Sequence, residues 1–190
     1  YIYVVLRGKA LPAVGPYPPG LPGFSYDLKG LSYDPAQARE LLKQSKYGGP
    51  EGLPPIVYTD AGIGNYVGLD VAAMAEMWQQ NLGVTITVEN IEYDYFYDQI
   101  FSGNHGQLFS GGWCADYPDP ENFADVLFHS GSDMNSAGYS NPQLDTLLEQ
   151  ARVERDVTKR MEMYHQAEQI IADDAPVLFT THSLSYELVK

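Results

Sequence analysis

The sequence contains one cysteine and few basic residues, and each scarcity excludes a class of protein. A single cysteine, Cys114, cannot form a disulfide within the chain, and no group of cysteines and histidines has zinc-binding spacing. With 11 Lys and Arg against 25 Asp and Glu, the formal net charge is −14. Nucleic acids and anionic membrane surfaces need a basic footprint, so this charge argues against both as partners.

Long apolar runs and common catalytic motifs are also missing. The sequence begins at Tyr1 without the basic and apolar regions of a signal peptide, and no run has the length of a membrane span. We therefore expect the sequence to be a fragment or a processed product. It has no phosphate-binding loop, no dinucleotide fingerprint and no GxSxG motif. No cofactor and no metal are implied.

Proline, glycine and tyrosine are the residues that shape the chain. Residues 8–33 hold five of the 13 prolines together with many glycines, which predicts an extended surface loop that wraps the domain. Fifteen tyrosines raise the aromatic fraction to 13%. Tyrosine is common at wet binding surfaces, although core packing explains many of these residues equally well.

Three helix starts use the same pair of residues, an N-cap acid or amide followed by proline. The pairs are Asp34-Pro35, Asp119-Pro120 and Asn141-Pro142. Apolar residues at helical spacing predict further helices over 65–82, 92–102 and 156–173, the first of them ended by Gly83.

Short apolar or alternating runs between these helices predict four strands. They cover residues 54–60, 84–91, 107–113 and 176–184. Because strands and helices alternate along the chain, the sequence predicts an α/β layer fold. With no internal repeat and no second linker, we expect a single domain over residues 1–190.

The stretch GGWCADYPDPENF, residues 111–123, follows the third predicted strand and carries the most chemistry. In α/β sheets, ligands bind beyond the carboxyl ends of strands. Two glycines would allow a ligand or a backbone to come close, and Trp113 would supply an apolar wall. Asp119 caps the next helix, whereas Asp116 has no cap to make, so its carboxylate is suited to hold an ammonium group.

Several alternatives remain open at this stretch. Asp116 could form a local turn or lie on the surface without a ligand, and Trp113 could simply pack in the core. Asp116, Asp119 and Glu121 offer oxygen ligands for calcium but lack the spacing of an EF-hand. The carboxylates could also form the acid/base pair of a hydrolase.

Five longer segments carry a resemblance to a known family. They are SYDPAQARELLKQSKY (32–47), MWQQNLGVTITVENIEYDYFYDQI (77–100), GGWCADYPDPENFADVLF (111–128), NSAGYSNPQLDTLLEQAR (135–152) and RMEMYHQAEQIIADDAPVLF (160–179). In content, order and spacing they resemble the oligopeptide-, dipeptide- and nickel-binding family of extracytoplasmic solute-binding proteins of ABC importers. The resemblance covers nearly the whole chain, and its third segment is the most specific.

The resemblance implies a fold and a ligand site. Family members have two lobes that close around the ligand, and this chain resembles the C-terminal lobe of such a type II periplasmic-binding-protein fold, with a mixed sheet flanked by helices. Asp116 matches the aspartate that holds the α-ammonium group of a bound peptide. Gly112 and Cys114 match positions that present backbone groups, and Trp113 and Tyr93 match ligand walls.

The resemblance also implies partners and shows departures. It implies a peptide ligand, an ABC permease, a monomer without catalysis, and a location in the periplasm or lipid-anchored at the cell surface. Some oligopeptide binders hold the peptide carboxylate with arginines where this chain has Ser110 and Ile100, so the length of the ligand stays open. Nickel chelates and oligosaccharides are alternative ligands in the same family. Cys114 is free or pairs outside the chain.

Overall fold

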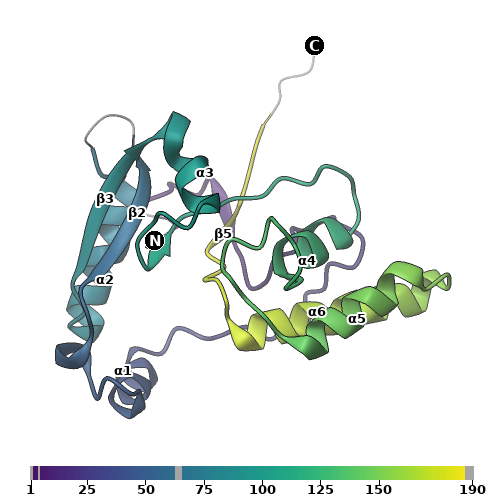
Figure 1. Ribbon diagram of the computed structural model, residues 1–190, viewed down its shortest axis with the longest axis horizontal. Helices are drawn as coiled ribbons and strands as arrows, with labels where there is room; N and C mark the ends of the chain where they lie inside the picture. The colour runs from purple at the N-terminus through teal and green to yellow at the C-terminus, as the bar shows by residue number, and fades with distance from the viewer. Residues whose placement is uncertain (1, 4, 63–65, 187–190) are drawn as a thin grey trace. The chain divides into compact units, whose positions relative to one another are not determined.

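A computed structural model describes residues 2–3, 5–62 and 66–186 of the chain (Figure 1). The described residues form two compact units. The first unit contains Tyr3–Arg7 and Ser32–Gly112, and the second contains Ile2, Gly8–Leu31 and Trp113–Lys190. That both belong to one lobe stays a prediction.

The first unit is a small parallel sheet with helices. Its strands are β2 (Ile56–Gly62), β3 (Ile86–Glu92) and β4 (Leu108–Phe109), in the order β3-β2-β4. Ile56 pairs with Ile86 and Tyr58 with Leu108, both in parallel register. The three carboxyl ends therefore meet at one edge of the sheet.

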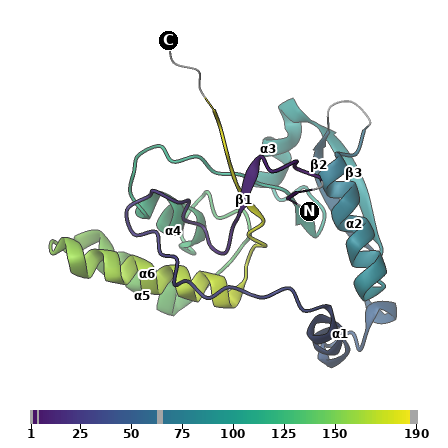
Figure 2. The ribbon, with the colours of Figure 1, turned by 180° about the vertical axis from the view of Figure 1, so that it is seen from behind.

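Three helices and one short 3₁₀ turn complete the first unit. They are α1 (Pro35–Gln44), η1 (Pro50–Gly52), α2 (Leu69–Leu82) and α3 (Tyr93–Phe101). Figures 1 and 2 show α2 alongside β2 and β3. Asp34 caps α1 through Gln37 N–H, and Gly83 ends α2 in the left-handed conformation, as the sequence predicts.

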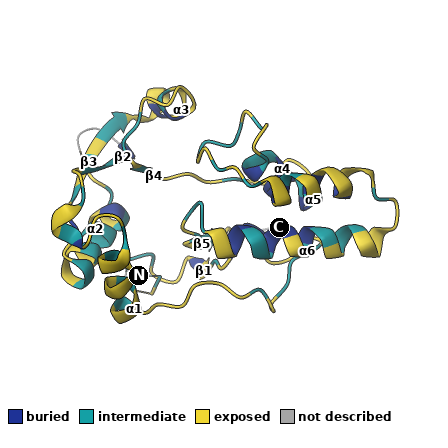
Figure 3. Ribbon diagram, turned by 60° about the horizontal axis from the view of Figure 1, so that its bottom comes forward, coloured by how far each residue is buried: buried dark blue, intermediate teal, exposed yellow. Residues whose placement is uncertain are grey.

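The second unit is mainly helical. It contains α4 (Glu121–Phe128), α5 (Pro142–Val153) and α6 (Val157–Asp174), together with an antiparallel pair of short strands, β1 (Ala10–Pro12) and β5 (Thr181–Ser183). Buried residues of the three helices face one another (Figure 3). The core they form is completed by Tyr17 from the loop after β1.

Residues 13–31, here called the strap, run along α6 (Figure 2). The Tyr17 hydroxyl donates to the Tyr164 carbonyl at 3.2 Å, and Gln169 exchanges two hydrogen bonds with the backbone of Lys29. The strap is therefore packed on the helix at several places.

The α/β class predicted from the sequence is confirmed, with three local corrections. Ala10–Pro12 is a strand within the proline-rich segment expected to be irregular, because it pairs with β5. The strand expected over 107–113 is only Leu108–Phe109, since the glycines that follow have no side chains to pack. Parallel and antiparallel strands lie in two separate sheets instead of one mixed sheet.

Candidate functional site

The loop after β4 places Trp113 and Asp116 differently. Trp113 is half-buried and packs against the core of the second unit. Asp116 is exposed, and the only hydrogen bond to its carboxylate among the described residues reaches Oδ2. Oδ1 therefore stays available to a ligand.

Asn122, in the first turn of α4, connects these two residues. Its Oδ1 accepts hydrogen bonds from Trp113 Nε1 and from the backbone N–H of Asp116, both at 3.0 Å. Its Nδ2 donates to Asp116 Oδ2 at 3.2 Å. Because Asn122 is only 2% exposed, the α4 core fixes its side chain, and that side chain orients the carboxylate.

The sequence pattern did not identify Asn122 as a residue of the candidate site. The one signal in its favour is a polar residue in the first turn of a helix whose other residues, apart from Glu121 and Asp125, are all apolar. A buried amide on such a face has to find partners within the protein.

Asp119 has a structural role, but it is not the N-cap that the sequence predicts. Helix α4 begins at Glu121 with Pro120 as its N-cap, and Asp119, one residue earlier, accepts the Glu121 backbone N–H on its Oδ1 at 3.0 Å. Arg160 donates to both carboxylate oxygens at 2.8 Å, and this pairing lowers the pKa of Asp119. The guanidinium also lies over the Tyr164 ring, 4.8 Å from its centroid.

These contacts leave few carboxylate oxygens free to bind a calcium ion. Arg160 occupies both oxygens of Asp119, and the Tyr117 hydroxyl donates to Glu121, a bond that raises the pKa of Tyr117. Within residues 2–3, 5–62 and 66–186, no group of three or more His, Cys, Asp and Glu could hold a metal ion.

The glycines and the cysteine of the loop face open space. A Cβ atom on Gly111 or Gly112 would meet no atom within 4 Å, and neither residue has a positive φ. Neither packing nor backbone conformation within this chain therefore requires glycine there. Cys114 is exposed and unpaired.

Tyr93 belongs to the first unit, as does Gly112, whereas Trp113, Cys114 and Asp116 belong to the second. Tyr93 is 62% exposed at the start of α3, and its ring meets that of Tyr97 edge to face. The role of Tyr93 as a ligand wall stays a prediction.

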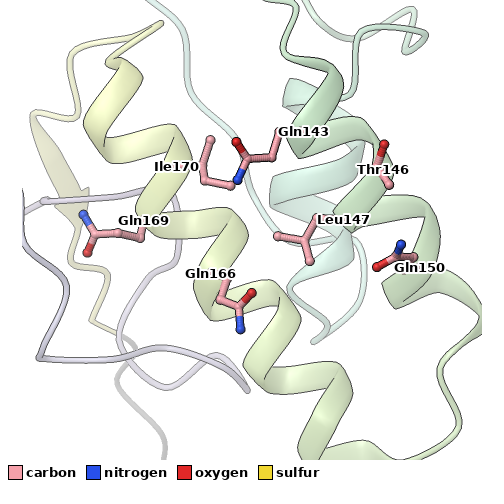
Figure 4. A pocket seen from close by; sticks show the side chains of 7 residues that line it. All are labelled: Gln143, Thr146, Leu147, Gln150, Gln166, Gln169 and Ile170. Carbon is pink, nitrogen blue, oxygen red and sulfur yellow. The ribbon is translucent and has the colours of Figure 1, made fainter.

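A shallow groove lies elsewhere, between α5 and α6. Four glutamines with Leu147 and Ile170 are among the residues that line it (Figure 4). None of the residues predicted to bind ligand takes part, so this groove gives no support to the site.

The first unit is a small parallel sheet with helices, and the second carries an exposed acid that the first turn of α4 orients. Residues 1–135 match the model of the bacterial extracellular solute-binding proteins, family 5 Middle, and the chain belongs to that family. The oligopeptide-binding protein OppA of Bacillus subtilis is 31% identical over 179 residues, which cover 91% of this chain and 32% of that protein.

Two further relatives agree. The di/tripeptide-binding protein 2 of Pseudomonas aeruginosa is 29% identical over 196 residues, which cover 98% of this chain and 35% of that protein. The periplasmic binding protein DppA of Helicobacter pylori, solved in complex with the peptide STSA, matches with a TM-score of 0.85 and 28% identity over 96% of this chain and 35% of that chain. The likeness confirms the predicted periplasmic-binding-protein fold.

The chain spans about a third of the length of these relatives. The family it belongs to consists of solute-binding proteins. Among the helices of the described residues, none has both the length and the apolar character that crossing a membrane requires.

Proposed function

We propose that this chain is the peptide-contacting part of the solute-binding protein of an ABC importer, and that Asp116 holds the α-ammonium group of the peptide. The exposed carboxylate of Asp116, oriented by the buried side chain of Asn122, is the observation that carries the proposal. An oriented carboxylate with a free oxygen is suited to a charge-assisted hydrogen bond from an ammonium group. The peptide-binding names of the relatives support the same ligand.

The distribution of charge also favours recognition of the amino terminus. Residues 47–151 contain no lysine and no arginine. Ile100 is 5% exposed, and Ser110 carries no charge. A ligand carboxylate therefore finds no lysine or arginine in this stretch, so the stretch does not fix the length of the peptide.

The remaining parts of the proposal follow from the family. The protein acts outside the cytoplasm, in the periplasm or lipid-anchored at the cell surface, and delivers its ligand to the membrane permease. It acts as a monomer and performs no chemical reaction. Gly112 and Cys114 present backbone groups to the ligand, and Trp113 and Tyr93 form its walls.

The test compares two ligands by calorimetry with the full-length gene product. One is a tripeptide with a free amino terminus, and the other is the same tripeptide after N-acetylation, which removes the positive charge. If Asp116 holds that charge, acetylation weakens binding by about 2 kcal/mol or more. Asp116→Asn gives a similar loss for the free peptide, while Asp133→Asn, at an exposed acid of the same unit, leaves both affinities unchanged.

Asn122→Ala provides a second, graded variant. It leaves Asp116 in place but removes the hydrogen bond that orients its carboxylate. We expect it to reduce the difference between free and acetylated peptide without abolishing it, and to add nothing to Asp116→Asn. An unchanged difference would mean that Asn122 only stabilises the loop.

The alternatives give other outcomes. Equal affinity for both peptides would assign the ammonium group to a different residue. Binding of an oligosaccharide or a metal chelate, with none of a peptide, would contradict the ligand class. Cleavage of a peptide or glycoside by the purified protein would favour the hydrolase alternative.

A further inference from the structure

Glu168 lies in the middle of α6 with its carboxyl group beneath the strap. The residue is only 1% exposed, and Oε2 has no hydrogen-bond partner among the described residues. Gly15 passes directly over it, since a Cβ atom there would lie 2.9 Å from Glu168 Oε1. A larger residue than glycine would therefore collide with the carboxyl group.

The contacts of the strap with α6 lie on both sides of Glu168. Tyr17 is bonded to Tyr164, one turn earlier on α6, and Lys29 is bonded to Gln169, the next residue. Farther along the strap, a Cβ atom at Gly23 would lie 3.5 Å from Pro120, the residue before α4. The strap thus connects the surroundings of Glu168 to the end of the candidate site loop.

No lysine or arginine pairs with the carboxyl group of Glu168 among the described residues, and the one ionisable base beside it is His165. Nδ1 of the partly exposed His165 lies 3.9 Å from Oε2 and has no hydrogen bond there. Tyr17, on the strap, and Tyr164 are neutral below pH 10, and burial raises the pKa of both phenols further. Arg160, which interacts with Tyr17, is already bound to both oxygens of Asp119. An ionised Glu168 would consequently be a buried charge stabilised only by the Tyr17 backbone and, when its ring is protonated, by His165.

Burial raises the pKa of Glu168 to about 8, and the backbone of Tyr17 opposes this shift only in part. The usual value is 4.5, so the closed strap retains a proton that an exposed carboxyl group would lose. A carboxyl group with a raised pKa stabilises the closed form fully below the usual value. That stabilisation is lost as the pH rises through about 8.

We propose that the strap is a proton-dependent latch, which stays on α6 while the Glu168 carboxyl group is protonated and opens when that group ionises. The proposal concerns regulation of the fold and does not depend on peptide binding. Opening removes the strap from Pro120 and so loosens the end of the loop that carries Asp116.

The test is amide hydrogen exchange in the full-length gene product between pH 5 and 9, corrected for intrinsic exchange rates. The Lys29 amide, which donates to Gln169, reports on the strap. We expect its opening constant to rise by up to about tenfold per pH unit between the two pKa values, because opening then releases one proton. Glu168→Gln removes this dependence, and Glu162→Gln, at an exposed position of α6, retains it.

Two results would overturn the latch. One is the same pH dependence in Glu168→Gln as in the unsubstituted protein, or a dependence confined to pH values near 6.5, where histidine titrates. The other is a titration of ¹³C-labelled glutamate carboxyl groups by NMR in which no glutamate titrates above pH 6. The second measurement needs no variant, so a Glu168→Gln protein that fails to fold does not leave the proposal undecided.

Discussion

The two units of this chain bury their apolar side chains to very different extents. The second unit has a contiguous core of ten residues, drawn from the strap and from α4, α5 and α6. In the described part of the first unit, the buried apolar side chains are Val71, Val84, Phe96 and Ile100. Several aromatic side chains of α3 remain exposed instead, as Figure 3 shows for much of that helix.

The comparison indicates how each unit is stabilised. The apolar faces of helices α4, α5 and α6 meet in one core, so each helix covers the apolar side chains of the other two. The first unit is held by the backbone hydrogen bonds of three parallel strands, and both faces of a parallel sheet are normally covered. We therefore expect the first unit to depend more on parts of the protein beyond this chain.

The largest expected effect tests the core of the second unit. Leu148, in α5, is fully buried, so Leu148→Ala leaves a cavity and should lower the free energy of unfolding by about 2–5 kcal/mol. Leu41→Ala, in α1 of the first unit, truncates a side chain that is 59% exposed and should cost less than about 1 kcal/mol. Urea denaturation of the two variants measures the difference.

Comparable losses for the two leucines would contradict the comparison. That outcome would mean that Leu41 is covered in the full-length protein by a part outside this chain. Leu82→Ala, in α2, serves as an intermediate point, because its side chain is half-buried.

The ion pairs of the two units also differ in burial. Arg160→Ala removes two 2.8 Å hydrogen bonds to the partly buried Asp119 and the contact with the Tyr164 ring. We expect a loss of about 1–3 kcal/mol in the free energy of unfolding. Lys43→Ala breaks the pair with Glu40 in α1, where both side chains are 61% exposed, and should produce no measurable change.

The Arg160 effect depends on pH in a defined direction. Hydrogen bonding to Arg160 lowers the pKa of Asp119 below its usual 3.8. The stabilisation is therefore present above that value and is lost as the pH falls through the lower pKa of the folded protein. Thermal unfolding between pH 2 and 6 should show a smaller acid sensitivity in Arg160→Ala. An equal sensitivity would assign the acid loss to other carboxylates.

Features that depend on residues close together in the sequence were predicted better than features that depend on residues farther apart. The caps formed by Asp34 and Asn141 act within three residues, and both were predicted correctly. The division of roles between Asp119 and Asp116 is also local. Asp119 does accept a backbone N–H at the start of α4, but the prediction that it is the N-cap is wrong, because Pro120 holds that position. The ligand role of Asp116 stays a prediction.

The features that the sequence did not reveal depend on contacts longer in range than a cap or a helical turn. Asn122 became part of the site because the loop folds back over α4, and Glu168 is buried because the strap crosses it. Strand β1 exists through its pairing with β5, about 170 residues later. Local patterns cannot contain such information.

We also expect only a small effect on stability at the last residue of the first unit, Gly112. Gly112→Ala adds a methyl group where no atom lies within 4 Å and φ is not positive, so the free energy of unfolding should change by less than about 0.5 kcal/mol. Gly83→Ala, also in the first unit, forces alanine to adopt a φ of 70° and should cost about 1–2 kcal/mol.

We expect the two glycine substitutions to affect peptide affinity in the opposite order, with the larger effect at Gly112. If a peptide backbone approaches Gly112, as proposed, the added methyl group weakens peptide binding although the protein is as stable as before. Gly83→Ala then lowers the stability and leaves the affinity unchanged. A Gly112→Ala protein with full affinity would show that the open space at this glycine receives no ligand, and the argument for the site would rest on Asp116 and Asn122 alone.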